Sequence, residues 1–160
     1  MAKKKIIILG NRGFLGAALY DCLKKKDGSE IIGFNSSNLD LKSPGTLNQI
    51  RSFIDKNTTI ISTARAPTEP DPLKTFNRDL AITSNIAQFI KKTPIKKFIY
   101  FSSISIYGES TSNLSITEET KIAPSSHYGI SKFTSEELLR KAAKEQETPL
   151  VVLLHGYGSS

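Results

Sequence analysis

Short apolar runs alternate with longer amphipathic stretches along the whole chain. Near-continuous apolar runs of this length are typical of strands that a parallel sheet buries on both faces. The predicted strands are residues 5–9, 30–34, 39–41, 59–63, 97–102 and 150–154. Between them, apolar side chains recur at helical spacing. The predicted helices are residues 13–26, 46–56, 75–92 and 126–146.

This alternation predicts an α/β fold: a doubly wound parallel sheet of about six strands with helices on both faces. No linker or internal repeat divides the chain, so residues 1–160 are predicted to form one domain. Ligands of such sheets bind beyond the carboxyl ends of the strands, at the point where the strand order reverses. The candidate polar segments that follow predicted strands are residues 10–16, 35–37, 63–66, 102–103 and 155–158.

A glycine-rich turn follows the first predicted strand and opens the first helix. Gly10 permits a tight turn, Gly13 lets backbone N–H groups approach a pyrophosphate, and Gly16 lets the helix pack closely on the strand. An ordinary glycine-rich loop is the alternative for the turn taken alone. In this context the turn predicts a dinucleotide site, as in a Rossmann-type domain. Its predicted cofactor-binding residues are Gly10, Asn11, Arg12, Gly13, Phe14, Leu15 and Gly16.

The residues after the second strand favour NADP as the cofactor. A NAD site usually has an acid there to bind the ribose hydroxyls, whereas this chain has Asn35, Ser36 and Ser37. An arginine with small hydroxyl residues suits a 2′-phosphate, which makes Arg12 the candidate for that group. The alternative is NAD, with Arg12 in solvent and Asp40 on the ribose.

Tyr128 and Lys132 are four residues apart in a predicted helix and therefore lie on one face. An ammonium beside a phenol stabilises the phenolate, so the phenol can exchange a proton with a carbonyl or an alcohol near neutral pH. The alternative is an ordinary solvated helix face. Ser103 ends the strand before this helix, 25 residues ahead of Tyr128, within a Ser-Ser-x-x-x-Tyr-Gly block at 102–108.

Together, the glycine turn, the block at 102–108 and the Tyr-x-x-x-Lys pair resemble the extended short-chain dehydrogenase/reductase family. Its members are NAD(P)-dependent nucleotide-sugar epimerases, dehydratases and reductases. The resemblance covers the N-terminal cofactor-binding part, and the family's C-terminal substrate domain is expected to be absent from residues 1–160. The Gly-x-Arg-Gly turn is similar to that of the NADP-using GDP-fucose synthase group.

The resemblance implies roles for single residues. Tyr128 would be the acid/base on the substrate oxygen, Lys132 would bind the nicotinamide ribose, and Ser103 would hydrogen-bond the substrate carbonyl or alcohol. The implied catalytic residues are therefore Ser103, Tyr128 and Lys132. The segment at 63–65 differs from the His-x-Ala-Ala-like turn that is usual there. Further implied cofactor-binding residues are Thr63, Ala64, Arg65, Asn77, Tyr128 and Lys132.

The expected function is that of an NADP-dependent oxidoreductase or epimerase that acts on a nucleotide-linked keto-sugar by hydride transfer. Which sugar, and whether the reaction is epimerisation, reduction or dehydration, stays open. The alternative is a cofactor-binding module without turnover that acts through a partner chain. An unpaired last strand also favours a homo-oligomer or a partner chain.

Charge and composition argue against nucleic-acid, membrane and metal partners. The net charge of +7 comes largely from lysines at predicted element ends, where they are solvated, and no nucleic-acid motif is present. No apolar run is long enough to span a bilayer, so no membrane partner is expected. The single cysteine, Cys22, cannot form an internal disulfide, which favours a cytoplasmic location. No metal site is expected.

Overall fold

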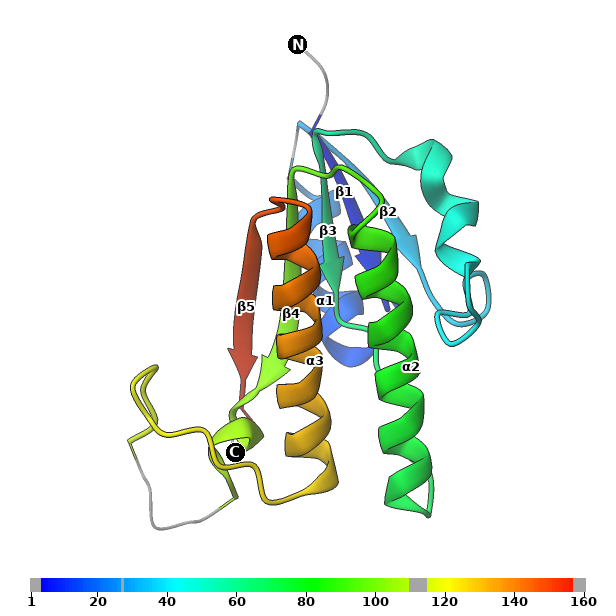
Figure 1. Cartoon of the computed structure of the whole chain (residues 1–160). Coiled ribbons are helices and arrows are strands. Elements are labelled where there is room, and N and C mark those ends of the chain that lie inside the picture. Colours follow the sequence, from blue (N-terminus) through cyan, green and yellow to red (C-terminus); the bar gives the residue numbers. More distant parts are fainter. Residues whose placement is uncertain (1–3, 27, 110–114, 157–160) are drawn as a thin grey trace.

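The computed structural model describes residues 4–26, 28–109 and 115–156. Within these residues one parallel sheet has the strand order β2-β1-β3-β4-β5 (Figure 1). The strands are β1 (Lys4–Leu9), β2 (Ser29–Phe34), β3 (Thr58–Ser62), β4 (Lys97–Ser103) and β5 (Leu150–His155). The α-helices are α1 (Phe14–Lys24), α2 (Pro72–Ile90) and α3 (His127–Glu145), and the 3₁₀-helices are η1 (Thr46–Phe53) and η2 (Ile104–Tyr107).

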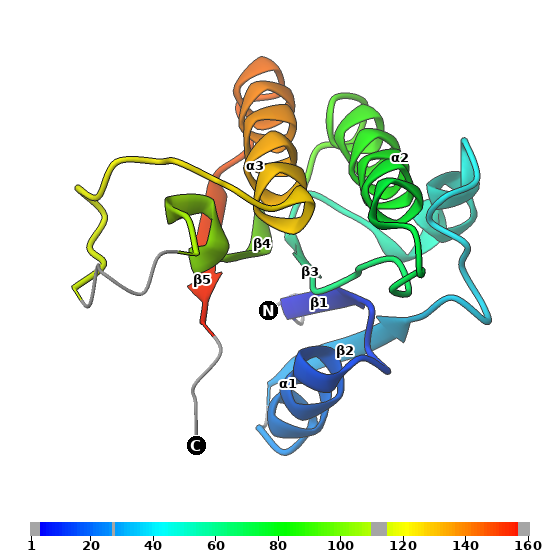
Figure 2. The same ribbon diagram turned by 90° about the horizontal axis from the view of Figure 1, so that it is seen from below.

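Helices cover both faces of the sheet. Figure 2 shows α1 on one face and α2 with α3 on the other. The chain runs from β1 outward to β2 and then returns across β1 to β3, β4 and β5. The predicted doubly wound fold is therefore confirmed, and its switch point lies between β1 and β3. The register pairs Leu9 with both Phe34 and Ser62, so the carboxyl ends of the three strands are level.

The core lies between the sheet and the pair α2–α3. Ile7, Ile60 and Phe98 come from the central strands, Ile90 from α2 and Leu139 from α3, and each is at most 1% exposed. Burying one such side chain stabilises the fold by about 1.5–3 kcal/mol. Ile7 and Ile8 on β1 and Ile60 and Ile61 on β3 are all buried, so these two strands appear as apolar runs. Along β4, buried and partly buried residues alternate instead.

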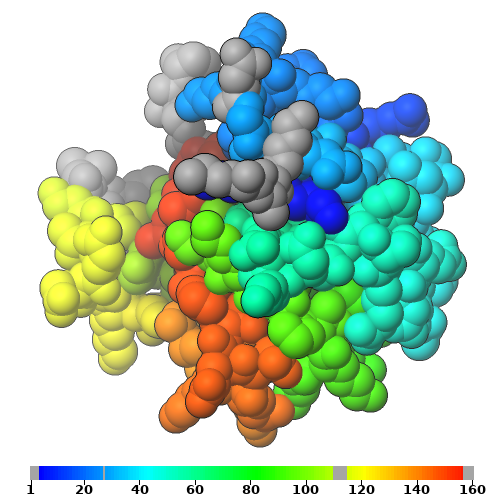
Figure 3. Space-filling view, turned by 90° about the horizontal axis from the view of Figure 1, so that it is seen from above, coloured from blue at the N-terminus to red at the C-terminus, as the bar shows by residue number. Residues whose placement is uncertain are grey.

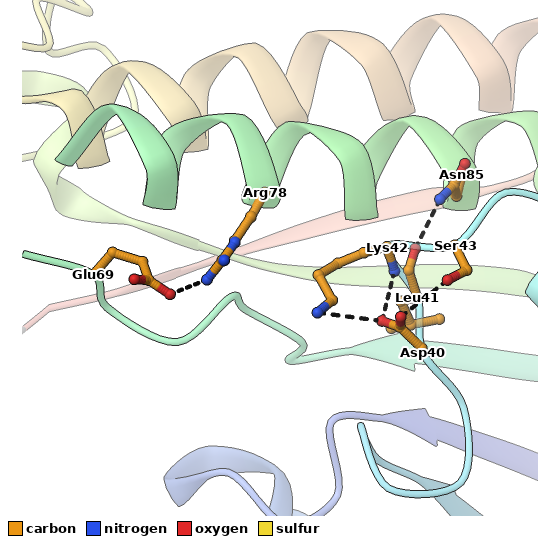
Figure 4. A network of polar contacts seen from close by, with 7 residues as sticks. All are labelled: Asp40, Leu41, Lys42, Ser43, Glu69, Arg78 and Asn85. Atoms are coloured by element: carbon orange, nitrogen blue, oxygen red, sulfur yellow. Dashed lines mark hydrogen bonds and ion pairs between the residues drawn. The ribbon is translucent and has the colours of Figure 1, made fainter. Parts of the chain in front are cut away.

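The prediction of a third strand at 39–41 is wrong, and the described sheet has five strands rather than about six. Leu39 and Leu41 are buried in a loop, where the Leu39 N–H donates to the Asn35 carbonyl at 2.8 Å. The Leu41 carbonyl accepts a 2.8 Å hydrogen bond from the Asn85 side chain on α2 (Figure 4). The alternating leucines reflect burial beneath α2 and not pairing in a ladder.

Two predicted helices differ in detail. The segment predicted as a helix over 46–56 is the 3₁₀-helix η1, in which Leu47 and Ile50 are buried. A spacing of three residues stacks side chains on one face when there are three residues per turn. Helix α2 begins three residues before the predicted start, at Pro72. Its N-cap Asp71 accepts a 3.0 Å hydrogen bond from the Leu73 N–H.

The predicted ligand-binding segments lie at one end of the sheet. Figure 3 views the molecule from the amino ends of the strands, where the cyan segment of η1 lies beside the green of α2. The segments that the sequence predicts to bind ligand lie at the opposite, carboxyl end. Among the described residues, no helix is long and apolar enough to cross a membrane.

Candidate functional site

The glycine turn is held against the ends of two strands by backbone hydrogen bonds. The N–H groups of Gly10 and Asn11 both donate to the Phe34 carbonyl, at 2.7 and 3.1 Å. On the other side, the Thr63 N–H donates to the Leu9 carbonyl at 2.9 Å. Gly10 has φ +94°, a conformation that favours glycine. The turn is thus fixed where β1, β2 and β3 end together.

Helix α1 approaches this turn closely. A Cβ at Gly16 would collide with the Gly10 carbonyl oxygen and would lie 2.7 Å from Thr63 Oγ1. At Gly13 a Cβ would meet only the Gly10 oxygen, at 3.4 Å. Gly13 is the N-cap of α1 and provides no side-chain cap, so the first N–H groups of the helix can receive a phosphate.

A pocket of about 470 Å³ extends from the glycine turn across the end of β2 and the loop after it. One part of its lining is apolar, the other polar. The apolar residues are Leu39, Leu41, Ala64, Ala66, Pro67 and Ile82. The polar residues are Arg12, Asn35, Ser36, Asp40, Lys42, Thr63 and Arg65. An apolar slot with a few polar groups at one end suits the adenosine part of a dinucleotide.

The polar end of this pocket is internally bonded. Asp40 accepts hydrogen bonds from the Ser43 hydroxyl (2.9 Å) and the Lys42 N–H (3.2 Å), and its carboxylate lies 3.7 Å from Lys42 Nζ (Figure 4). Slight burial acts to raise the pKa of Asp40. The hydrogen bonds and the charge of Lys42 outweigh burial and leave this pKa below its ordinary value. The Asp40 carboxylate is therefore already occupied by neighbours.

Asn11 and Asn35 connect the glycine turn to the end of β2. The Asn35 side-chain amide donates to Asn11 Oδ1 at 3.3 Å, and Asn35 Oδ1 accepts from the Ser37 hydroxyl at 2.6 Å. Ser37 is exposed and is not among the residues that line the pocket. Of the predicted hydroxyl residues after β2, the structure thus places Ser36 at the pocket and Ser37 beside it.

A second pocket, of about 670 Å³, continues from the glycine turn toward α3. Gly13, Thr63 and Arg65 line both pockets, so the two adjoin along the carboxyl end of the sheet; together they are called the groove. Phe14, which is 89% exposed, and Leu15 stand at its edge. The remaining lining residues are Gly16, Phe101, Ser102, Tyr128, Lys132, His155 and Gly156. Tyr157 and Gly158 lie outside the described residues.

Tyr128 and Lys132 lie on the first turns of α3. The Ser126 side chain caps this helix by accepting from the Gly129 N–H at 3.1 Å. A Cβ at Gly129 would lie 2.5 Å from the Ser105 carbonyl, so the start of α3 packs directly on η2. The predicted pair is thereby brought to the groove, with Lys132 Nζ 5.9 Å from the Tyr128 ring centroid.

Lys132 is almost fully buried. Its Nζ donates to the Phe101 carbonyl at 2.9 Å and to the Tyr100 hydroxyl at 3.4 Å. Burial lowers the pKa of Lys132 to about 8, while the negative charge of Asp79 acts in the opposite direction. Burial likewise raises the pKa of Tyr100 far above its ordinary value. Tyr100 is thus a neutral hydroxyl beneath the lysine.

Two further charged residues lie beside Tyr128. The guanidinium of Arg65 stands 4.7 Å from the Tyr128 ring centroid, closer than Lys132. Asp79 on α2 is 8% exposed and accepts a 2.7 Å hydrogen bond from the Ala66 N–H. Burial raises the pKa of Asp79, although the hydrogen bond from Ala66 and the charges of Lys132 and Arg65 act to lower it.

Ser103 and Asn77 do not line the groove. Ser103 is the buried N-cap of η2: its Oγ accepts from the Ser105 N–H and donates to Ser105 Oγ, each at 3.2 Å. Its neighbour Ser102 is the residue that lines the groove. Asn77 is exposed on α2 and lines neither pocket of the groove. Asp79, two positions later, lines a smaller pocket beside Tyr128.

Sequence reasoning missed Asp79 and Lys42. Asp79 shares the buried face of α2 with Thr75, Ile82 and Ile86. An acid on the apolar face of an amphipathic helix was the available signal, because such a group is costly to bury without a role or a partner. Lys42 had no comparable signal, since its place at the pocket depends on the path of the loop.

No cluster suited to a metal ion is found in the part of the chain that the structure describes: no group of three or more His, Cys, Asp or Glu side chains is placed to bind one.

The sequence matches the NAD dependent epimerase/dehydratase family over residues 6–159. The chain belongs to this family. It is 30% identical over 167 residues to a UDP-glucose 4-epimerase of Vibrio cholerae, an alignment that covers 94% of this chain and 50% of the relative. The chain thus spans about half the length of this curated relative.

Solved structures show the same fold. A UDP-glucuronic acid 4-epimerase of Bacillus cereus in complex with NAD has a TM-score of 0.73 and 22% identity, with 95% of this chain and 56% of that chain covered. A GDP-D-glycero-L-gluco-heptose synthase of Campylobacter jejuni, in the presence of NADPH, has a TM-score of 0.81 and 20% identity. That alignment covers 100% of this chain and 50% of the other.

Proposed function

We propose that this chain forms the cofactor-binding part of an NADP-dependent oxidoreductase or epimerase that acts on a nucleotide-linked keto-sugar by hydride transfer. The observation that carries the proposal is the groove that joins the glycine turn to Tyr128 and Lys132. Membership of the NAD dependent epimerase/dehydratase family supports it. A cytoplasmic location is part of the proposal.

Each part of the groove has a role in this proposal. Leu39, Leu41 and Ile82 would hold the adenine, and the first N–H groups of α1 would hold the pyrophosphate. Lys132 would bind the nicotinamide ribose. When bound, the nicotinamide supplies the group that accepts and returns the hydride. Asn77 remains a proposed cofactor contact that the groove itself does not include.

Tyr128 would act as the acid/base. Its ring lies half-buried at the groove, with the charges of Arg65 and Lys132 4.7 and 5.9 Å from its centroid. It would take the proton from a substrate alcohol as the hydride leaves the same carbon, and it would return that proton when a ketone is reduced. Ser103 would hydrogen-bond the same substrate oxygen and so fix its position.

The preference for NADP rests on the end of the adenosine pocket. Arg12 and Lys42 both line it, and two cations suit a 2′-phosphate. Asp40 also lines the pocket, but Ser43 and Lys42 already bond its carboxylate. An acid occupied in this way is a poor acceptor for the ribose hydroxyls of NAD.

A titration of purified protein into NADPH and NADH tests this preference. The fluorescence of the reduced nicotinamide serves as the signal, since the chain contains no tryptophan. We expect tighter binding of NADPH, and we expect Arg12→Gln to weaken NADPH about tenfold while it changes NADH less than about twofold. Tighter NADH binding by the unaltered protein would assign Asp40 to the ribose. No binding of either cofactor would overturn the proposal.

A second candidate function is a cofactor-binding module without turnover that acts through a partner chain. The edge of β5 supports association, because Leu153 and Leu154 on this outer strand are 41% and 38% exposed. We therefore propose a homo-oligomer or a complex with another chain.

Tyr128→Phe separates the two functions. In an enzyme it should lower turnover of the nucleotide-sugar substrate at least about a hundredfold. NADPH affinity should stay within about threefold, because the aromatic ring is kept. A protein whose action through its partner survives Tyr128→Phe would be the binding module. Sedimentation of the purified chain, alone and with its partner, measures the association.

A further inference from the structure

Arg65, Lys132 and Tyr128 lie together at the place where the loop after β3 meets α3. Arg65 Cζ is 4.7 Å and Lys132 Nζ is 5.9 Å from the centroid of the same Tyr128 ring. The charge of Arg65 acts to lower the pKa of Lys132, so the two cations repel each other, and burial of Lys132 strengthens this repulsion because the local dielectric is low. A negative charge nearby would offset the repulsion.

The structure offers two acids at this place, and one of them is already paired. Glu69 and Asp79 both line a small pocket of about 160 Å³ between the loop after β3 and the starts of α2 and α3, together with Arg65 and Tyr128. Figure 4 shows the guanidinium of Arg78 pointing to the Glu69 carboxylate, with which it forms an ion pair. Of the two acids that line this pocket, Asp79 is the one left to interact with Arg65 and Lys132.

Asp79 also fixes the loop from which Arg65 extends. Its Oδ1 accepts a 2.7 Å hydrogen bond from the N–H of Ala66, the residue next to Arg65. Ala66 is 3% exposed and Asp79 is 8% exposed, so solvent does not compete for this bond. The carboxyl group thus connects α2 to the loop by one oxygen and keeps the other for electrostatic interactions.

We propose that Asp79 is a positioning residue: its carboxylate carries the counter-charge for Arg65 and Lys132 and holds the Arg65 loop, so that two cations flank the ring of Tyr128. Asp79 and Arg65 act on Lys132 in opposite ways. The negative charge of Asp79 raises the pKa of Lys132, and the positive charge of Arg65 lowers it.

The other charged and titratable groups around Lys132 set the background for this effect. They are Tyr100 on β4, which stays neutral, and Tyr128 and Glu136 on α3. Glu136 acts on Lys132 in the same direction as Asp79, but more weakly. Burial raises the pKa of Glu136 itself. Removal of Asp79 should thus be felt by Lys132 despite Glu136.

The experiment follows the titration of Lys132 in purified protein without any cofactor. Lysines labelled with ¹³C at the ε-carbon are observed by NMR, and Lys132 is assigned by the resonance that Lys132→Arg removes. We expect Asp79→Asn to lower the Lys132 midpoint by about one pH unit and Arg65→Gln to raise it. Glu69→Gln removes the acid that Arg78 already pairs, and it should leave the midpoint within about 0.2 pH unit.

Several outcomes would overturn the proposal. An unmoved or raised midpoint in Asp79→Asn would remove Asp79 as the counter-charge, and so would an equal shift in Glu69→Gln. Asp79→Glu keeps the charge and should restore most of the shift, which a merely structural role of Asp79 would not explain. If Asp79→Asn fails to fold, Arg65→Gln still decides, because an unmoved midpoint there contradicts the shared charge set.

Only the effect of Asp79 on catalysis rests on the proposed function; its effect on the charge of Lys132 does not. Failure to bind NADPH would overturn the proposed function and leave the Lys132 titration interpretable. Conversely, an unmoved titration in Asp79→Asn would overturn the role of Asp79 while the cofactor proposal stands.

Discussion

The two ends of the groove are built by different means. At the glycine turn, the positions are set by backbone hydrogen bonds and by the absence of side chains at Gly10 and Gly16. At the tyrosine end, they are set by charged side chains from the loop after β3, from α2 and from α3. The first end is local in sequence; the second joins residues that are more than sixty positions apart, such as Arg65 and Tyr128.

This difference has a physical consequence. Backbone groups and glycines carry no titratable charge, so the geometry of the glycine turn does not depend on their protonation. Burial lowers the pKa of Lys132 to about 8, so the tyrosine end changes its charge within an accessible pH range. We expect the glycine turn to fail through steric change and the tyrosine end to respond to charge and pH.

The largest effect is expected at the glycine turn. Gly16→Ala forces a Cβ against the Gly10 carbonyl and should lower the free energy of unfolding by about 4 kcal/mol. Gly13→Ala in the same turn is the matched control: its Cβ has a 3.4 Å contact, and the cost should be within about 1 kcal/mol. Urea unfolding measures both. Equal costs would show that close packing at Gly16 does not set the turn.

A pH-dependent effect is expected at the tyrosine end. Lys132 has its pKa lowered from 10.5 to about 8 in the folded protein, so between these values the unfolded chain binds more protons and stability rises with pH. The cost of burying the charge is fully present below pH 8 and is relieved by about pH 10.5, a change of about 3 kcal/mol.

Lys132→Met should abolish this contribution. Urea unfolding at several pH values from 7 to 10 compares the two proteins, with Lys141→Met on the exposed side of the same helix as the control. As the pH rises, the unfolding free energy of the unaltered protein should increase relative to that of Lys132→Met. Parallel pH profiles would mean that Lys132 is not desolvated in the folded protein.

The smallest of the three effects concerns the serines at the end of β4. Ser103→Ala should lower kcat about a hundredfold, if its hydroxyl leaves Ser105 to bond the substrate oxygen. Ser102→Ala, in the adjacent residue that lines the groove, should change kcat less than about threefold. Steady-state kinetics with NADPH would separate them. The reverse order would assign the hydrogen bond to Ser102.

Much of the fold was predictable because its signals are local. The buried strands appear as apolar runs, and the glycine turn appears as a spacing of three glycines between a strand and a helix. The strand at 39–41 was predicted wrongly because burial under α2 and pairing in a sheet produce the same alternation of leucines. Only the partner atoms, such as the Asn85 amide on the Leu41 carbonyl, distinguish them.

The site was predictable in part. Tyr128 and Lys132 could be placed together because four residues of helix bring two side chains to one face. Asn77 was predicted from the family resemblance, and Asp79 was missed because the sequence does not state where the inward face of α2 lies at its first turns. The structure orients that face by the hydrogen bond from Ala66 to Asp79.

The sequence by itself determined the alternation of the five strands with helices, the glycine turn and the Tyr128–Lys132 pair, because each depends on residues that are near neighbours along the chain. Tertiary structure alone decided which charges share the groove. α2, α3 and the loop after β3 pack together, and this packing brings Arg65 to Tyr128 and Asp79 to the Ala66 N–H. Arg78 pairs with Glu69 and not with Asp79 for the same reason. Electrostatic interactions act through space, so their partners follow from packing and not from spacing.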